Sequence, residues 1–241
     1  MEFDHLFHPP LDRDPLFDLP SEGVDFGDRL DELKATRKRA SEQINAQPNI
    51  FDEGEERVFS PQDYLRCFWP LRLRPGYRMG CREVEHSNGY EKVVQLVFTA
   101  SNGQDLDSDS MMEALQGDDT PWSYLLASFF WRDVEAAGDI YMGWGGWSGH
   151  MFVSSAEEAE TASFFGPPDN QEERWTWSFK PKDFLPRVFM DRETAKVVFY
   201  SYCGSGLEAI SQHLDVYKRG SYKPEHHERT VATSGLSIII D

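Results

Sequence analysis

The sequence predicts an α+β fold, in which a mainly antiparallel sheet is packed by several helices and preceded by an extended N-terminal arm. The patterned segments come in the order helix, several strands, helices, then more strands, which is not the regular alternation of a doubly wound fold. Aromatic residues make up 14% of the chain, enough to build a sizeable core despite the low mean hydropathy. Residues 1–26 contain four prolines, which exclude a helix interior or a central strand there.

The domain organisation follows from that arm. We predict an extended arm rich in Pro, Phe and Asp over residues 1–26 and a single α+β domain over residues 27–241. Two alternatives stay open for the arm, because its phenylalanines suit docking in surface grooves while its prolines also suit disorder. The aromatic residues concerned are Phe3, Phe7, Phe17 and Phe26.

Helices are predicted where apolar residues recur at helical spacing. The first covers residues 27–46 with Asp28 as its N-cap, and the longest covers residues 122–137, where Pro121 starts a helix with a broad apolar stripe. Shorter helices are predicted over residues 111–115 and 155–163, the second capped by Ser155, and another over residues 206–217.

Strands are predicted where apolar residues alternate or β-branched and aromatic residues cluster. Lys92–Thr99 has the strongest strand pattern, and a hairpin is expected around residues 191–194. The predicted strands are Tyr64–Trp69, Leu71–Arg74, Tyr77–Glu85, Lys92–Thr99, Met151–Val153, Arg174–Lys180, Pro186–Met190, Ala195–Tyr202 and Val231–Ile240.

The charge of the chain is strongly acidic and unevenly distributed. The formal net charge is -18, and residues 93–160 carry twelve acidic side chains against one base, Arg132. Residues 1–34 carry ten acidic and three basic side chains. Such a surface repels nucleic acid and anionic membranes and attracts cationic proteins. We therefore expect a basic protein partner, and neither nucleic acid nor membrane as a ligand.

Cysteine content and targeting patterns indicate a cytoplasmic protein. The three cysteines, Cys67, Cys81 and Cys203, are too few for a disulfide framework. The chain opens without a charged and then apolar leader, and no apolar run approaches the roughly 20 residues that span a bilayer. No pattern indicates a cofactor.

The first candidate catalytic site is Cys203-Gly204-Ser205-Gly206, between an apolar strand and the predicted helix over residues 206–217. A glycine-containing turn from a strand to a helix can expose a nucleophile, here Cys203, with His213 or His150 as its base. The segment lacks the Gly-x-Ser-x-Gly spacing and the Gly-Lys of a phosphate-binding loop. A compact turn in which Ser205 caps the helix is the alternative.

Metal binding is not predicted. Asp105, Asp107 and Asp109 alternate as in a calcium loop, but Ser110 and Gln116 stand where that loop needs Gly and Glu. His226 and His227 are neighbours, and neighbouring residues of a strand point to opposite faces, so we predict a solvated polar loop instead. The remaining histidines, including His213, show no ligand spacing.

A segment rich in glycine and tryptophan is the best local candidate for binding. Trp144 and Trp147 flank two glycines and precede His150. Indole rings offer flat apolar platforms, and exposed tryptophans often anchor interfaces. In the alternative interpretation, the tryptophans pack inward from a turn.

These observations predict an acidic binding protein, such as an inhibitor or an immunity-type protein that neutralises a basic partner. Acidic side chains would steer the encounter, and buried aromatic residues would supply most of the affinity. The residues predicted to contact the partner are Asp105, Asp107, Asp109, Asp118, Asp119, Trp122, Trp144 and Trp147. The alternatives are an enzyme that uses Cys203, Ser205 and His213, or an assembly protein whose arm docks on a neighbouring subunit.

Overall fold

The computed structural model describes residues 15–20, 22–45, 60–85, 92–107, 110–136, 150–162, 174–204 and 207–237. The helices are α1 (Leu30–Asn45), α2 (Pro61–Cys67), α3 (Pro121–Ala136) and α4 (Ala156–Thr161), with 3-10 turns η1 (Pro15–Phe17), η2 (Gly27–Arg29) and η3 (Met111–Ala114). The strands are β1 (Val24–Asp25), β2 (Arg72–Leu73), β3 (Arg78–Glu85), β4 (Lys92–Thr99), β5 (Asp105–Leu106), β6 (Leu115–Gln116), β7 (His150–Val153), β8 (Trp175–Trp177), β9 (Arg187–Met190), β10 (Thr194–Cys203), β11 (Leu207–Lys218) and β12 (Pro224–Ser237).

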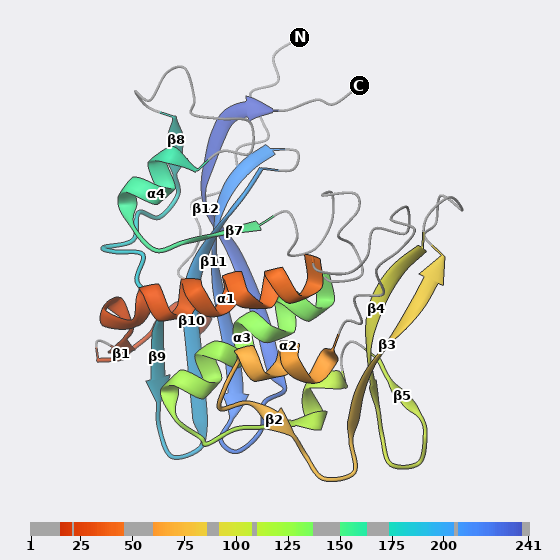
Figure 1. The fold of residues 1–241 in the computed structure, drawn as a ribbon. Helices are drawn as coiled ribbons and strands as arrows, with labels where there is room; N and C mark the ends of the chain where they lie inside the picture. The colour runs from red at the N-terminus through yellow and green to blue at the C-terminus, as the bar shows by residue number, and fades with distance from the viewer. Residues whose placement is uncertain are drawn as a thin grey trace.

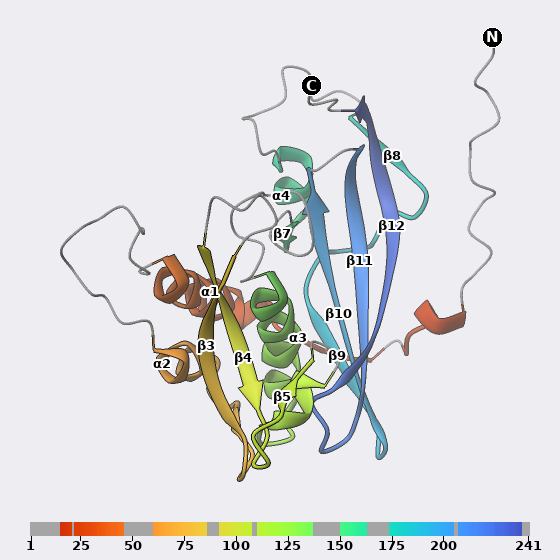
Figure 2. The same ribbon diagram turned by 90° about the vertical axis from the view of Figure 1, so that its right-hand side faces the viewer.

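One large antiparallel sheet organises the molecule. Its strands follow the order β1-β9-β10-β11-β12-β8, and β7 also pairs with β10. The sheet curls into a half-barrel, so the predicted α+β class holds in a form dominated by the sheet (Figure 1). A hairpin of β3 and β4, extended by β5, lies on the other side of α3 from the large sheet (Figure 2).

Helix α3 is the centre of the main core. Figure 2 shows it between the large sheet and the layer that contains α2 and the β3–β4 hairpin. Phe129 packs on Phe199 of β10, with ring centroids 4.8 Å apart. Phe130 points the other way and packs edge-on against Phe68, at 5.1 Å. The broad apolar stripe predicted from the sequence exists because α3 is covered on both sides.

Several predicted elements are confirmed. These are the helix that forms α1, the core helix α3, the strand β4, and the hairpin of β9 and β10. Ser155 caps α4 as predicted, since its side chain accepts from the Glu158 N–H. The predicted N-cap Asp28 is wrong, because it lies inside the η2 turn that precedes α1. The predicted strand over residues 231–240 belongs to the longer β12, and residues 238–240 lie outside the described residues.

The helix predicted over residues 206–217 is wrong, because this segment forms strand β11. It pairs with β10 on one side and β12 on the other. Its residues alternate between two faces that are both buried, with Ile210 and Leu214 on one face and His213 and Asp215 on the other. Polar residues are buried on both faces of β11, so the alternation of apolar and polar residues that identifies a strand is absent. Tertiary pairing overrode the local helix pattern.

The strand predicted over Tyr64–Trp69 is also wrong, because these residues lie in α2 and the turn after it. Ser60 accepts from the Asp63 N–H, and Pro61 occupies the first turn, where its missing N–H costs nothing. Tyr64 and Phe68, four residues apart, both face Phe130 of α3. The aromatic residues that suggested a strand therefore form the buried face of a short helix.

Part of the arm lies against the domain. Phe17 is buried beneath the guanidinium of Arg229, which lies 4.3 Å from the ring centroid. Val24 pairs with Val188, and Phe26 packs against Trp122 with centroids 5.5 Å apart. The docking alternative thus holds for the segment after Pro15, while residues 1–14 lie outside the described residues. The boundary between arm and domain stays a prediction.

The packing of Phe130 gives a first test of this core. Phe130→Ala should lower the free energy of unfolding by about 3–5 kcal/mol, because it leaves a cavity among Tyr64, Phe68 and Phe98. Met151→Ala is the control, since this side chain is exposed and its loss should change stability by less than about 0.5 kcal/mol. Urea unfolding followed by tryptophan fluorescence measures both, and equal effects would contradict the packing described here.

Candidate functional site

The predicted steering acids lie along the segment from β5 to α3, which runs across the lower end of the molecule in Figure 1. Asp105 accepts from the Thr99 hydroxyl at 2.9 Å and is exposed. Asp107 accepts from the Ser110 N–H at 2.8 Å and is exposed as well. Asp109 lies outside the described residues. The Thr99 hydroxyl and the Ser110 N–H therefore help to orient the first two carboxylates.

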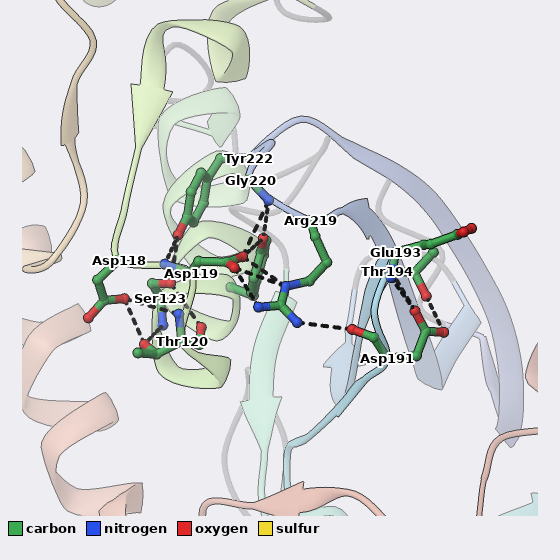
Figure 3. Close-up of polar contacts among 11 residues, drawn as sticks. Asp118, Asp119, Thr120, Ser123, Asp191, Glu193, Thr194, Arg219, Gly220 and Tyr222 are labelled. Atoms are coloured by element: carbon green, nitrogen blue, oxygen red, sulfur yellow. Dashed lines mark hydrogen bonds and ion pairs between the residues drawn. The ribbon is translucent and has the colours of Figure 1, made fainter.

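Asp118 and Asp119 are neighbours in sequence, but their carboxylates have different hydrogen-bond partners (Figure 3). Asp118 accepts from the hydroxyl and N–H of Thr120, at 2.7 and 3.2 Å, just before α3 begins. Partial burial opposes ionisation of Asp118, but the Thr120 donors outweigh it and lower the pKa of this carboxyl. The charge of Asp118 is thus fixed and exposed at the helix entrance.

Asp119 is the centre of an internal network. Its backbone adopts a φ of 59°, a left-handed conformation that Asp tolerates better than most residues. The guanidinium of Arg219 donates to its carboxylate, with Nε 2.9 Å from Oδ1. The Tyr124 hydroxyl donates to the same oxygen. Its backbone N–H donates to the Tyr222 hydroxyl at 2.9 Å. This network ties the start of α3 to the β11–β12 turn (Figure 3).

The three tryptophans predicted to anchor a partner are either buried or outside the described residues. Trp122 is only 8% exposed, because Phe26 packs on it and the Arg29 guanidinium lies 3.7 Å from its ring centroid. Its role is therefore structural rather than that of an exposed anchor. Trp144 and Trp147 lie outside the described residues.

The predicted nucleophile turn is not a strand-to-helix turn. Cys203 ends β10 and the chain returns as β11, so there is no helix for Ser205 to cap, and Ser205 itself lies outside the described residues. Cys203 pairs with Ala209, and His213 lies four residues further along β11, about 13 Å at the usual rise per residue. His150 of β7 is the direct register partner of Cys203. The proposed pair of Cys203 and His213 is thus wrong.

His213 instead belongs to a polar cluster on the face of the sheet that α3 covers, here called the α3 face. Its Nε2 lies 2.7 Å from Ser201 Oγ, and His150 Nδ1 lies 2.9 Å from the same oxygen. Ser201 is fully buried and His213 is 1% exposed. Three strands, β7, β10 and β11, therefore contribute one side chain each to a hydrogen-bonded chain.

A buried ion pair borders the same cluster. Arg132 of α3 donates to both carboxylate oxygens of Asp215 on β11, at 2.6 and 2.8 Å. Asp215 is fully buried, and Arg132 is 2% exposed. Burial would raise the pKa of Asp215, but the charge and hydrogen bonds of Arg132 lower it far more. The carboxylate therefore stays ionised inside the protein.

Strand β12 completes the cluster at its solvent-facing side. His226 pairs in register with Asp215, and its Nδ1 lies 2.7 Å from Asp215 Oδ1. Glu228 pairs in register with His213, and its Oε2 lies 3.6 Å from His213 Nδ1 and 3.9 Å from His226 Nε2. The solvated loop predicted for His226 and His227 is thus wrong, because both lie in a strand.

The protonation of His213 follows from its surroundings. Burial lowers its pKa well below the ordinary value, and the positive charge of Arg132 lowers it further. The imidazole is therefore neutral at physiological pH, with one nitrogen lone pair available as a base or a metal ligand. Buried titratable groups gathered in this way are typical of functional sites, although structural networks also produce them.

Sequence reasoning missed this cluster because its residues come from four separate segments. The only local signal was the spacing His213-x-Asp215 and His226-x-Glu228, which places each pair on one face of a strand. The helix predicted for β11 and the loop predicted for β12 concealed that signal.

Comparisons with known proteins identify no relative. No protein-family model, no curated protein and no solved structure matches this chain. Within the part of the chain that the structure describes, no helix is long and apolar enough to cross a membrane.

The Asp119 network predicts a pH dependence of stability. The Arg219 and Tyr124 donors lower the pKa of Asp119 from 3.8 to about 2. Its ionised form thus stabilises the fold fully above 3.8, and this contribution is lost as the pH falls towards 2. Asp119→Asn should be less stable than the native protein at neutral pH, and the difference should shrink in acid. Urea midpoints measured across this range test it, and a difference that stays constant with pH would contradict the role of the carboxylate.

Breaking the buried ion pair between Arg132 and Asp215 should lower the stability of the protein more than the loss of the Asp119 charge does. Arg132→Met should destabilise the protein by about 3–5 kcal/mol, because Asp215 is left charged and buried. The double variant Arg132→Met, Asp215→Leu should recover most of that loss. Arg66→Met is the surface control, since the Arg66–Asp63 pair is 78% and 48% exposed and is worth less than about 1 kcal/mol. Denaturant unfolding distinguishes the three, and a double variant no better than the single would contradict the argument.

Proposed function

We propose that this chain is an acidic binding protein that neutralises a basic protein partner, as an inhibitor or an immunity-type protein does. The proposal rests on which groups donate hydrogen bonds to the exposed carboxylates between β5 and α3. Asp107 accepts from the Ser110 N–H, and Asp118 accepts from the hydroxyl and N–H of Thr120, so neutral donors orient both carboxylates. With a net charge of -18, the chain offers a fixed negative field to a cationic surface.

The fixed positions of these charges matter for binding. A carboxylate that is already oriented loses little conformational freedom when a partner arrives, so less of the interaction energy is spent on ordering it. For Asp107, the donors of Ser110 also lower the pKa, so that its charge persists in mild acid. Long-range attraction between such charges and a basic protein raises the association rate and makes it sensitive to salt.

We assign this role to fewer residues than the sequence alone suggested. Asp119 is left out because Arg219 neutralises it, and Trp122 is left out because it is buried. Asp105, Asp107 and Asp118 remain the proposed steering residues, and Asp109, Trp144 and Trp147 remain proposed contacts. In the enzyme alternative at Cys203 and Ser205, His213 cannot be the base because it lies about four residues along the neighbouring strand, which leaves His150, the register partner of Cys203, as the candidate base.

The test compares two triple variants with equal changes of charge. The first is Asp105→Asn, Asp107→Asn, Asp118→Asn, in which each amide oxygen can still accept the local hydrogen bonds. The control is Asp31→Asn, Glu42→Gln, Glu157→Gln, which alters exposed acids on α1 and α4. A basic protein captured from source-cell lysate at low salt and released at high salt serves as the binding partner.

The first triple variant should slow association with that partner about tenfold at low salt, while the control triple should change it far less. High salt should remove the difference between them. Stopped-flow association kinetics at several salt concentrations measure both. Equal slowing by the two triples, or none by either, would show that these three carboxylates do not guide binding.

A further inference from the structure

We propose that His213, His226 and Glu228 form a binding site for one divalent transition-metal ion. Two imidazoles and one carboxylate converge from two adjacent strands, with one ligand atom of each within 4.8 Å of the others. Metal binding here is independent of a basic partner, because the residues lie on the α3 face of the sheet and not in the β5–α3 segment.

The geometry is close to what an ion requires. Ligand atoms about 2.1 Å from one zinc ion at tetrahedral angles lie about 3.4 Å from each other. Glu228 Oε2 lies 3.6 Å from His213 Nδ1 and 3.9 Å from His226 Nε2. The side chain of Glu228 is 39% exposed, so a small rotation can bring its carboxylate inward. The two histidines lie nearly parallel, with ring centroids 5.7 Å apart.

Each histidine has a partner at its other nitrogen that can fix its orientation. His226 Nδ1 lies 2.7 Å from Asp215 Oδ1, which turns Nε2 towards Glu228. His213 Nε2 lies 2.7 Å from Ser201 Oγ, which turns Nδ1 towards the same carboxylate. A carboxylate behind the imidazole is a usual support of a metal-bound histidine, and the Ser201 hydroxyl oxygen can accept from His213 Nε2–H in the same way. An ion at Nε2 would select the tautomer in which Nδ1 donates to Asp215. Arg132 Nη2 lies 2.6 Å from His226 Nδ1 and can only donate, so metal binding would require this guanidinium nitrogen to move away from Nδ1.

The charges around the site permit a cation. The positive charge of Arg132 is cancelled by Asp215, with which it forms two hydrogen bonds. Glu228 then contributes one negative charge to the ligand set. His150 lies on the far side of Ser201 and does not belong to the ligand set. One carboxylate and two neutral imidazoles are the donors of many zinc and iron(II) sites.

The ligand set also indicates the class of ion and the kind of site. Calcium and magnesium prefer oxygen donors, so two nitrogen ligands favour zinc or another late transition ion. Three protein ligands leave at least one coordination position for water or a bound molecule, whereas structural zinc sites use four. His226 is 27% exposed on its side chain, so that position faces solvent rather than the core.

Strand β12 supplies matched controls. His227 and Glu225 alternate with His226 and Glu228 along the strand and contact each other at 3.2 Å, on the opposite side. Glu228→Gln and Glu225→Gln therefore remove the same charge from the same strand, inside and outside the site. Ser201→Ala removes only the hydroxyl behind His213 and tests whether the ligand's orientation matters.

The experiment is titration of the full chain with Zn²⁺ in competition with a chromophoric chelator, followed by Co²⁺ substitution. The native protein should bind one Zn²⁺, and bound Co²⁺ should give visible d–d absorption. Glu228→Gln should weaken binding by at least about tenfold and change the cobalt spectrum, and Ser201→Ala should weaken it by about tenfold. Glu225→Gln and His227→Asn should bind as the native protein does. Circular dichroism confirms that each variant is folded.

Two results would overturn the proposal. One is a native chain that binds no Zn²⁺, or binds it so weakly that the chelator removes it completely. The other is binding that Glu225→Gln weakens as much as Glu228→Gln, which would place the ion on the general acidic surface.

Discussion

The position of α3 on the large sheet is set by the buried ion pair between Arg132 and Asp215. This pair joins the core helix α3 to the central strand β11 in a region without solvent, where neither charge is tolerable without the other. Arg132 donates one hydrogen bond to each carboxylate oxygen of Asp215. This bidentate geometry holds α3 against β11 and also fixes its position along the strand. The aromatic contacts of Phe129 and Phe130 then fill the space on either side of the helix.

That ion pair also sets the chemistry of the residues around it. The charge of Arg132 helps to keep His213 neutral, and Asp215 holds His226 by its Nδ1. The same carboxylate thus balances a cation and orients an imidazole. A polar cluster of this kind costs stability unless every member is satisfied, so its presence beneath α3 calls for a functional reason. The metal ion that we propose at His213, His226 and Glu228 would supply one.

Acidic residues that count equally in the composition have different partners in the folded structure. Asp118 and Asp119 are adjacent, yet one is held by Thr120 and keeps its full charge while the other is matched by Arg219. Glu113 is likewise matched by Lys223 at 2.7 Å. A count of acidic residues therefore overstates the field that a partner meets, and the carboxylates held by neutral donors provide what remains.

The amino-acid sequence was enough to predict the α+β class, the helices α1, α3 and α4, the hairpin of β9 and β10, and the acidic character of the chain. Those features depend on local periodicity, on capping residues such as Ser155 and on composition. The tertiary contacts determine that residues 207–218 form a strand, that Tyr64 and Phe68 lie in α2 and the turn after it, and that His213 meets Ser201, His226 and Glu228. Strand register joins residues that are distant in sequence, and the burial of His213 and Asp215 on the α3 face removed the alternation that marks a strand.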